Sequence, residues 1–411
     1  MGVPHAAYSR GGVMQDHVAH QRHNLFMRTR RAHKEESDTN WQAEASPLAG
    51  ADLTQYDAWT QIGTCPAHSR KKEVALHGMP AMLFSYAECA PMMKELLADI
   101  YRIEVPLPRN PLRIINSYVV RGPDRFLMID TGMNRPESIE VMRAGIESLA
   151  IDLDRTDLFI THGHSDHVGL VSELKTGPTR IFLHPADAAI VRDPQLWSNL
   201  ARSAHLHGFP DADTAVGKHP GKKYLFTGQP DFTPLREGDT LAIGRYRFRC
   251  VETPGHTPGH LCLFEPDAGI FFSGDHILDS ITPNISGWAQ ENEDPLGDFL
   301  ASLDKVAAYD IRLVLPGHRN AITDHRRRIQ ELKAHHQARA QEVADILGRG
   351  AQTAYEVASR MTWDLSYSRW DDFPIPQQWF ATGEALAHLL YLERKGEIVR
   401  TWNDGMASFS M

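Results

Sequence analysis

Hydrophobic positions change their spacing at about residue 100. Residues 1–95 are rich in His, Arg, Gln and Ser and have weak periodicity, which predicts a poorly ordered N-terminal extension. The more apolar residues 79–97 could hold a short helix. From residue 100 onward, apolar runs of strand length are separated by turn residues. The first three runs cover 100–107, 114–121 and 125–132.

Helical spacing alternates with these strands. Residues 136–150 repeat apolar side chains at helical intervals, and shorter helices are predicted at 168–174, 186–192 and 299–308. Further strand-like runs lie at 157–164, 180–185, 241–252, 260–265, 269–275 and 311–318. Strands that alternate with helices, with polar clusters at the strand ends, predict a layered α/β domain with its ligand site in those end loops.

The pattern becomes helical after about residue 324. Residues 326–347 have the length and spacing of one long helix, and Thr353 to Glu356 is a capping box that opens a second helix ending near Met361. A Trp-rich connection precedes a third helix, predicted between Thr382 and Lys395, and a short β wing. This order predicts a small winged-helix-like domain over 326–411. Its third helix has mixed charge, which favours packing over DNA reading.

Composition narrows the class of protein. A chain of 411 residues suits two domains, and 42% hydrophobic with 23% charged residues is typical of a soluble globular protein. No apolar run has the roughly 18–20 residues of a membrane span, and no secretory signal is expected. The scattered cysteines indicate a reducing cytoplasm, with Cys250 and Cys262 as buried thiols. The net charge of −9 argues against a nucleic-acid partner.

A dense group of metal-ligand residue types follows the strand-like run at 157–161. The segment T-H-G-H-S-D-H-V-G contains His162, His164, Asp166 and His167. Alternate residues of an extended loop point the same way, so His162 and His164 can bind one ion. Asp166 and His167 begin a helix and can face a second ion. These nitrogen and carboxylate donors suit zinc, and also manganese or iron.

Three more donors stand at later strand ends: His256, Asp275 and His318. A glycine next to each donor permits a sharp turn that delivers the side chain to the cleft. The ordered set H-x-H-x-D-H, then His, Asp and His, resembles the metallo-β-lactamase-fold superfamily of hydrolases over about residues 98–325. The branch that it resembles carries a winged-helix-like C-terminal domain.

That resemblance implies a four-layer αββα sandwich over 96–325 and a role for each donor. A first metal would be bound by His162, His164 and His256, a second by Asp166, His167 and His318, with Asp275 bridging the two and Asp130 orienting a ligand histidine. Two zinc ions would generate a metal-bound hydroxide near neutral pH, with Asp166 and Asp275 as the catalytic carboxylates.

The bridging Asp275 favours an ester, thioester or lactone hydrolase over a true β-lactamase. Three alternatives stay open: phosphodiester or endoribonuclease cleavage, a mononuclear-iron persulfide-type dioxygenase, and a non-catalytic binding module. A small-molecule substrate is expected, without nucleic acid or membrane, and enzymes of this build often form homodimers.

Several further residues have competing interpretations. Specificity is expected from the insert 187–232, the loop 281–295 and the stretch near Trp370. His260 is interpreted as structural, whereas His184 and His276 are candidate partners of the ligands. Solvated loop positions are favoured for His205, His207 and His219, and Tyr224 is a candidate oxyanion donor. Packing of the two domains is favoured over an acyl-binding wall for Trp288, Trp370 and Trp379.

Overall fold

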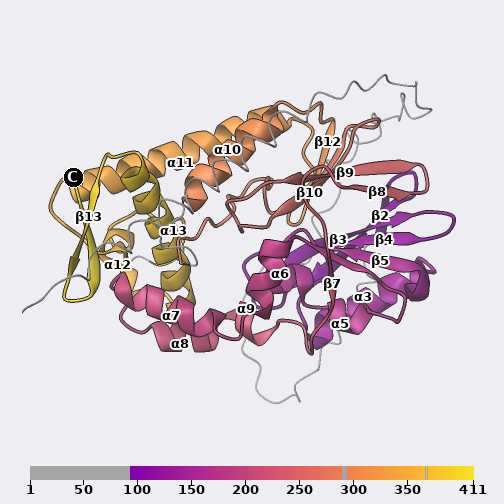
Figure 1. The fold of residues 1–411 in the computed structure, drawn as a ribbon, viewed down its shortest axis with the longest axis horizontal. Helices are drawn as coiled ribbons and strands as arrows, with labels where there is room; N and C mark the ends of the chain where they lie inside the picture. Colours follow the sequence, from indigo (N-terminus) through magenta and orange to yellow (C-terminus); the bar gives the residue numbers. More distant parts are fainter. Residues whose placement is uncertain (1–92, 289–293, 366, 368) are drawn as a thin grey trace, which may run out of the picture. The chain divides into compact units, whose positions relative to one another are not determined.

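Two β-sheets form the centre of the computed structural model (Figure 1), which describes residues 93–288, 294–365, 367 and 369–411. The strands of the first sheet follow one another in chain order: β1 (Met93–Leu97), β2 (Ile100–Pro106), β3 (Ile114–Arg121), β4 (Phe126–Ile129), β5 (Thr156–Phe159), β6 (Ile181–Leu183) and β7 (Phe232–Pro234). The pairs from β1 to β4 are antiparallel, and the pairs from β4 to β7 are parallel.

The second sheet has the order β12-β11-β10-β9-β8. Its strands are β8 (Thr240–Ile243), β9 (Tyr246–Glu252), β10 (Leu261–Glu265), β11 (Ile270–Gly274) and β12 (Leu313–Pro316). Only β11 and β12 pair in parallel within it. Because β9 and β11 are both antiparallel to β10, the strands β9, β11 and β12 all run in the same direction.

Apolar side chains join the sheets and helices into layers. One cluster packs α3 (Pro136–Ser148) and α5 (Val171–Leu174) against the first sheet. Another packs α10 (Pro295–Ala307) and α11 (His325–Leu347) against the second sheet. Figure 1 shows both helices beside that sheet. Between the sheets, the ring of Tyr118 lies 5.2 Å from that of Phe272. The expected four-layer αββα sandwich is therefore confirmed.

The segment expected to be a loop-rich insert is largely helical. It contains α6 (Pro185–Arg192), α7 (Leu196–Leu206), α8 (Ala212–Lys218) and α9 (Pro220–Lys223). Buried alanines of α7 and α8 join the apolar cluster of the C-terminal helices. Helix α6 confirms the helix predicted at 186–192. The small residues of α7 and α8 gave little periodic signal in the sequence, which explains why these two helices were missed.

The C-terminal part follows the expected order of three helices and a β-hairpin. The helices are α11, α12 (Ala354–Ala358) and α13 (Ile375–Arg394), and the hairpin is formed by β13 (Val399–Asn403) and β14 (Met406–Ser410). The capping box at Thr353 and Glu356 is present. The start predicted for the third helix was wrong, because α13 begins seven residues before Thr382. Trp379, the fifth residue of α13 and 2% exposed, anchors this early part of the helix by its burial.

Other element boundaries also differ from the predictions. The helix predicted at 168–174 is divided into α4 (Ser165–Val168) and α5. Residues 241–252 contain two strands joined at Gly244, whose φ of 57° is readily adopted by glycine. Helix α10 starts before residue 299 because Asp294 accepts a hydrogen bond from the Gly297 N–H and Pro295 occupies the first position.

The expected N-terminal extension lies almost entirely outside the described residues. Its last residues, 93–95, form part of β1, which pairs with β2, so the helix suggested for 79–97 is wrong at this end. The described residues all belong to the compact unit Asp52–Met411. In the described ranges, no helix is both long enough and apolar enough to cross a membrane. Cys250 and Cys262 are buried free thiols, as expected.

Candidate metal centre

The parallel strands bring the predicted donors to a common edge. In the first sheet, β4, β5 and β6 end just before Asp130, His162 and His184. In the second sheet, β9, β11 and β12 run the same way and lead into His256, Asp275 and His318. Because the carboxyl ends of co-directional strands meet at one edge, loops far apart in sequence deliver their side chains to one place.

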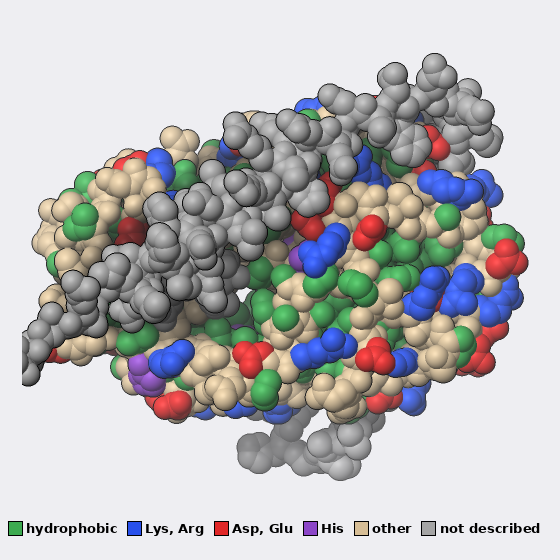
Figure 2. All heavy atoms as spheres, in the orientation of Figure 1, with side chains coloured by type: hydrophobic (Ala, Val, Ile, Leu, Met, Phe, Trp, Pro, Cys, Tyr) green, Lys and Arg blue, Asp and Glu red, His purple; other side chains and the backbone are tan. Residues whose placement is uncertain are grey.

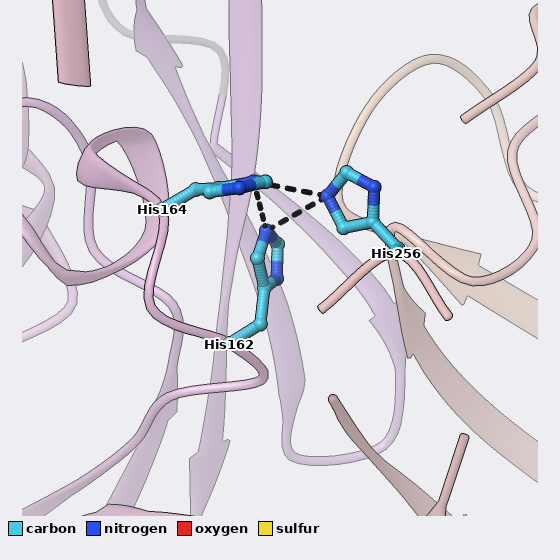
Figure 3. Close-up of side chains that lie close together, drawn as sticks. All are labelled: His162, His164 and His256. Atoms are coloured by element: carbon cyan, nitrogen blue, oxygen red, sulfur yellow. Dashed lines mark hydrogen bonds between the residues drawn. The ribbon is translucent and has the colours of Figure 1, made fainter. Parts of the chain in front are cut away.

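The first group of donors is formed by three histidines from two loops. Figure 3 shows the rings of His162, His164 and His256 pointing toward one another. The Nδ1 atom of His164 lies 3.0 Å from Nε2 of His162 and 3.0 Å from Nε2 of His256, and the two Nε2 atoms are 3.2 Å apart. This is the trio predicted for a first metal.

The second group contains Asp166, His167 and His318, all buried. The Nε2 atom of His318 lies 3.4 Å from Oδ2 of Asp166. Asp275 stands between the two groups. Its Oδ1 atom is 3.5 Å from Nε2 of His167 and 3.6 Å from Nε2 of His318, while Oδ2 is 3.6 Å from Nε2 of His256. One carboxylate therefore faces both trios.

The spacing and the unsatisfied state of the candidate ligand atoms are those expected around a bound cation. Nitrogens bound tetrahedrally to zinc at about 2.0–2.1 Å would stand about 3.3 Å apart, close to the spacing in the first trio. Two atoms of the second trio, Nε2 of His167 and Nε2 of His318, are buried without a hydrogen-bond partner among the described residues, and so is Oδ1 of Asp275. Such buried polar atoms are costly unless satisfied, and a shared cation would satisfy all three.

Three of the candidate ligand histidines have their opposite ring nitrogen held by a neighbour. His256 Nδ1–H donates to the Asn284 carbonyl at 2.9 Å, and His318 Nδ1–H donates to the Ile114 carbonyl at 2.7 Å. His167 Nδ1–H donates to Oδ2 of Asp130 at 2.8 Å. These bonds leave each Nε2 lone pair directed at the cluster, which is the tautomer that a metal requires.

Asp130 supports the site through Thr161 as well. Its carboxylate accepts hydrogen bonds from the Thr161 N–H at 2.8 Å and from the Thr161 hydroxyl at 2.9 Å. The Thr161 hydroxyl oxygen lies 3.0 Å from Nδ1 of His162 and accepts its proton. Asp130 therefore orients His167 directly and His162 through one intermediate, in line with the role that the resemblance implied.

Electrostatics distinguish the histidines of the two groups. Burial lowers the pKa of His162 well below its usual value, with the neighbouring histidines adding to the effect. Burial would also lower the pKa of His167, but Asp130, Asp275 and Asp166 raise it well above the usual value. The charges of His318 and His167 hold the pKa of Asp275 well below its usual value despite burial. The second group therefore carries the stronger negative charge for a cation to neutralise.

Glycines beside the donors serve two different purposes. Gly255 has a φ of 133°, a conformation that glycine adopts at little cost, and a Cβ there would lie 2.5 Å from the Phe299 Cα. At Gly317 the need is for space, because a Cβ would lie 2.9 Å from Asp275 Oδ1 and 2.9 Å from a carbon of the His167 ring. The predicted sharp turn thus applies at Gly255 and at Gly274, which has a φ of 48° beside Asp275.

Asp187 is a supporting residue that sequence reasoning did not identify. Its buried carboxylate accepts hydrogen bonds from the Gly163 N–H at 2.7 Å, the Thr257 hydroxyl at 2.8 Å and the Gly259 N–H at 2.7 Å. It thereby ties the loop of His162 and His164 to the loop of His256. Burial raises its pKa, although these hydrogen bonds oppose the shift. Only its place in the first turn of α6, shortly after the end of β6, could have drawn attention to it.

The remaining histidines near the strand ends have separate roles. His260 is structural, as expected: its Nε2 accepts from the Asp275 N–H at 3.1 Å, and its Nδ1–H donates to the Thr253 hydroxyl at 2.7 Å. Within the described structure, no hydrogen bond joins His184 or His276 to a candidate ligand. His184 bonds to Glu252 instead, at 3.0 Å.

The insert histidines differ from one another. His205 is solvated, with 47% of its side chain exposed. His207 is fully buried, which contradicts the expected solvated position, because its insert segment is a packed helix end and its Nδ1–H donates to the Ser203 carbonyl at 2.8 Å. His219 is partly buried among aromatic rings. That contradicts the solvated position expected for it.

Trp288, which follows β11, and Trp379, on α13, pack two parts of the chain together, as favoured from the sequence, whereas Trp370 contacts a residue of the C-terminal part itself. The rings of Trp288 and Trp379 lie 4.9 Å apart, and the Trp288 indole N–H donates to the Trp379 carbonyl at 3.2 Å. Trp370 packs against Tyr355 at 5.4 Å. The Arg135 guanidinium lies over the ring of Tyr224 at 4.8 Å. An oxyanion role for Tyr224 stays a prediction.

An αββα sandwich with a histidine–aspartate cluster at its strand ends defines a class of metallo-hydrolase folds. Residues 110–318 match the family model described as the metallo-beta-lactamase superfamily, and residues 340–411 match the metallo-beta-lactamase-like C-terminal domain. The chain belongs to the metallo-beta-lactamase superfamily and is a hydrolase of that fold.

Relatives cover most of the described chain. A metallo-beta-lactamase family protein from Thermus thermophilus is 30% identical, with a TM-score of 0.67 over 77% of this chain and 100% of its own. A probable metallo-hydrolase of Bacillus subtilis is 24% identical over 76% of this chain and 97% of its own. An atrochrysone carboxyl ACP thioesterase of Cryptosporiopsis is 24% identical over 63% of this chain and 71% of its own.

Proposed function

We propose that this chain is a dinuclear metal-dependent hydrolase that cleaves a thioester, a carboxylic ester or a lactone. The observation that carries the proposal is the pair of donor trios with Asp275 between them, its two oxygens 3.5 Å from Nε2 of His167 and 3.6 Å from Nε2 of His256. The relatives named as ACP thioesterases favour the thioester within this group.

Two cations, for which we expect zinc with manganese or iron as alternatives, would lower the pKa of a bound water and polarise the substrate carbonyl. His162, His164 and His256 would hold one, and Asp166, His167 and His318 the other, with Asp275 shared. Asp166 directs Oδ2 toward His318, so its other oxygen would orient the attacking water. Asp130 and the Ile114 and Asn284 carbonyls keep the rings aligned during turnover.

Metal content and hydrolysis test the proposal together. We expect close to two zinc or manganese ions per purified chain by elemental analysis, and turnover in a panel of thioesters, esters and lactones. His256→Ala and Asp275→Ala should lose turnover and metal together, whereas His205→Ala, which changes an exposed histidine of α7, should keep both. Full activity in either ligand variant would contradict the site assignment.

The same measurements address the alternatives. About one iron per chain, with oxygen consumption on persulfides, would favour the dioxygenase hypothesis. Two metals with cleavage of RNA or DNA alone would favour the phosphodiesterase.

On the face drawn in Figure 2, Lys and Arg side chains are interspersed with acidic and apolar ones. That distribution gives the nucleic-acid hypothesis no added support.

We further propose that the enzyme acts on a small molecule in the cytoplasm and that it forms a homodimer. The C-terminal helices and hairpin would form a winged-helix-like domain over 326–411. The two buried thiols suit a reducing compartment. Sedimentation equilibrium tests the dimer: a mass of one chain at micromolar concentration would contradict it.

A further inference from the structure

Aromatic rings from three separated segments meet at His219. The His219 ring centroid lies 5.0 Å from that of Trp197 on α7 and 5.2 Å from that of Phe380 on α13. The ring of Trp379, which is buried, lies 6.3 Å from that of His219. His219, Trp197 and Phe380 are each partly exposed, so these three residues, called here the aromatic surface, offer ring faces or edges to a ligand.

Contacts on two sides locate the aromatic surface beside the candidate metal centre. Helix α9, which His219 caps, packs against α4, the helix that carries Asp166 and His167. On the other side, the Asn284 side-chain amide donates to the Phe380 carbonyl at 3.5 Å, while the Asn284 carbonyl accepts from His256 at 2.9 Å. The segments that carry the aromatic surface therefore contact the segments that carry both donor trios.

His219 presents a hydrogen-bond donor within this surface. Its Nδ1 accepts from the Gly221 N–H at 3.1 Å, so the proton of the neutral ring is on Nε2. Burial lowers the pKa of His219 to about 4, although Asp166 opposes the shift, and the ring is neutral at pH 7. Among the described residues, Nε2 has no hydrogen-bond partner. A donor of this kind, next to apolar rings, is typical of the polar groups that orient ligands in mostly apolar sites.

We propose that His219, Trp197 and Phe380 form a substrate subsite for a planar unsaturated group of the acyl portion that bears an oxygen acceptor. The rings would contact the planar group by stacking or edge contact, and His219 Nε2–H would donate to the acceptor. The position of this group relative to the scissile bond rests on the proposed function. Binding of the group itself does not.

Binding of neutral ketones tests the subsite without requiring hydrolysis. Acetophenone and cyclohexyl methyl ketone have the same carbonyl and nearly the same size, but only the first is planar and aromatic. We expect the purified full chain to bind acetophenone about 2- to 10-fold more tightly, as aromatic contacts provide. Dissociation constants from ligand-observed NMR titration would measure this. Equal affinities would overturn the proposal.

Two variants separate the ring contact from the hydrogen bond. Phe380→Leu should reduce the preference for acetophenone, because it removes one of the three rings. His219→Asn keeps an oxygen that can cap α9 through the Gly221 N–H but removes the ring and Nε2–H, so it should weaken binding of acetophenone at least about 3-fold. His205→Asn, on the exposed part of α7, is the matched control and should bind like the unaltered chain. Unchanged binding in both subsite variants, with unchanged unfolding midpoints, would refute the assignment.

Turnover links the subsite to the reaction. In the metal-loaded protein, kcat/KM for a benzoyl thioester should exceed that for the cyclohexanecarbonyl thioester, and Phe380→Leu should reduce the ratio mainly through KM. An aryl preference in ketone binding with no hydrolysis of any thioester, ester or lactone would uphold the subsite and reject the proposed function. Hydrolysis without any aryl preference in binding or turnover would uphold the proposed function and reject the subsite.

Discussion

The Oδ2 atom of Asp130 lies 2.8 Å from Nδ1 of His167, and Asp130 adopts a left-handed backbone conformation with φ of 58°. That conformation costs a non-glycine residue about 1–3 kcal/mol. It turns the chain after β4 so that one carboxylate reaches both Thr161 and His167. A strained residue that fixes a ligand ring indicates that the site geometry, rather than local stability, determines this turn.

Asp130→Asn should weaken metal binding more than it weakens the fold. The amide can no longer accept every proton that the carboxylate accepts from Thr161 and His167, so the ligand rings lose their fixed orientation. Loss of such partners reduces metal affinity about 10- to 100-fold. Competition with a chromophoric chelator measures the affinity. Asp124→Asn, at an exposed turn, is the control, and equal affinities for the two variants would contradict the positioning role.

Asp187→Asn should weaken metal binding by His162, His164 and His256, because Asp187 holds together the two loops that carry these histidines. One amide oxygen cannot replace both carboxylate oxygens, so a hydrogen bond to the loop of Gly163 or to that of Thr257 and Gly259 is lost. We expect metal affinity about 10-fold lower, with the loss confined to one of the two metals. Stepwise metal titration by calorimetry resolves the two events. An equal fall in both affinities would mean that Asp187 only stabilises the fold.

Trp379→Ala should destabilise the chain strongly. Trp379 is 2% exposed and packs against Trp288, so its removal opens a large cavity. Truncation of a buried tryptophan costs about 3–5 kcal/mol. Guanidinium unfolding measures the free energy of unfolding. Trp402→Ala, in a side chain 51% exposed, should cost far less; similar losses in the two variants would contradict the packing assigned to Trp379.

Acid should destabilise the packing of α11 on α13 through His336. His388 Nδ1–H donates to the Glu384 carbonyl at 2.9 Å, so His388 Nε2 accepts from His336 at 3.3 Å. Burial lowers the pKa of His336 to about 2 and that of His388 to about 4. Both values lie below the roughly 6.5 of an unfolded chain, so the unfolded chain binds protons first.

Stability is therefore full above about pH 6.5 and falls as the pH drops below it, by about 1.4 kcal/mol per pH unit for each neutral buried histidine. His336→Phe removes one such group. Between pH 6.5 and 5.5, the loss of unfolding free energy should be about 1 kcal/mol smaller in this variant than in the original chain. The control His205→Gln should show the same loss as the original chain. An identical pH dependence in all three proteins would show that His336 is not buried in the neutral form.

The sequence by itself determined the fold class and the seven candidate ligands. Strand and helix periodicity over 100–325 predicted the layered architecture, because alternation of apolar residues reflects burial on one face. The donors of 162–167 stand within six positions, and each later donor follows an apolar strand beside a glycine. Local spacing of this kind is visible without knowing which strands pair.

Only the tertiary structure decided how distant segments support and border that site. Asp187 joins loops that are 24 and 70 residues away. His219 meets Phe380 on a helix whose first turn had no clear sequence signal, and whose start was misplaced by seven residues. Such contacts depend on packing between elements far apart in the chain. Their residues therefore have no characteristic local pattern, whereas the candidate metal ligands do, because each lies in the loop or helix start that follows a strand.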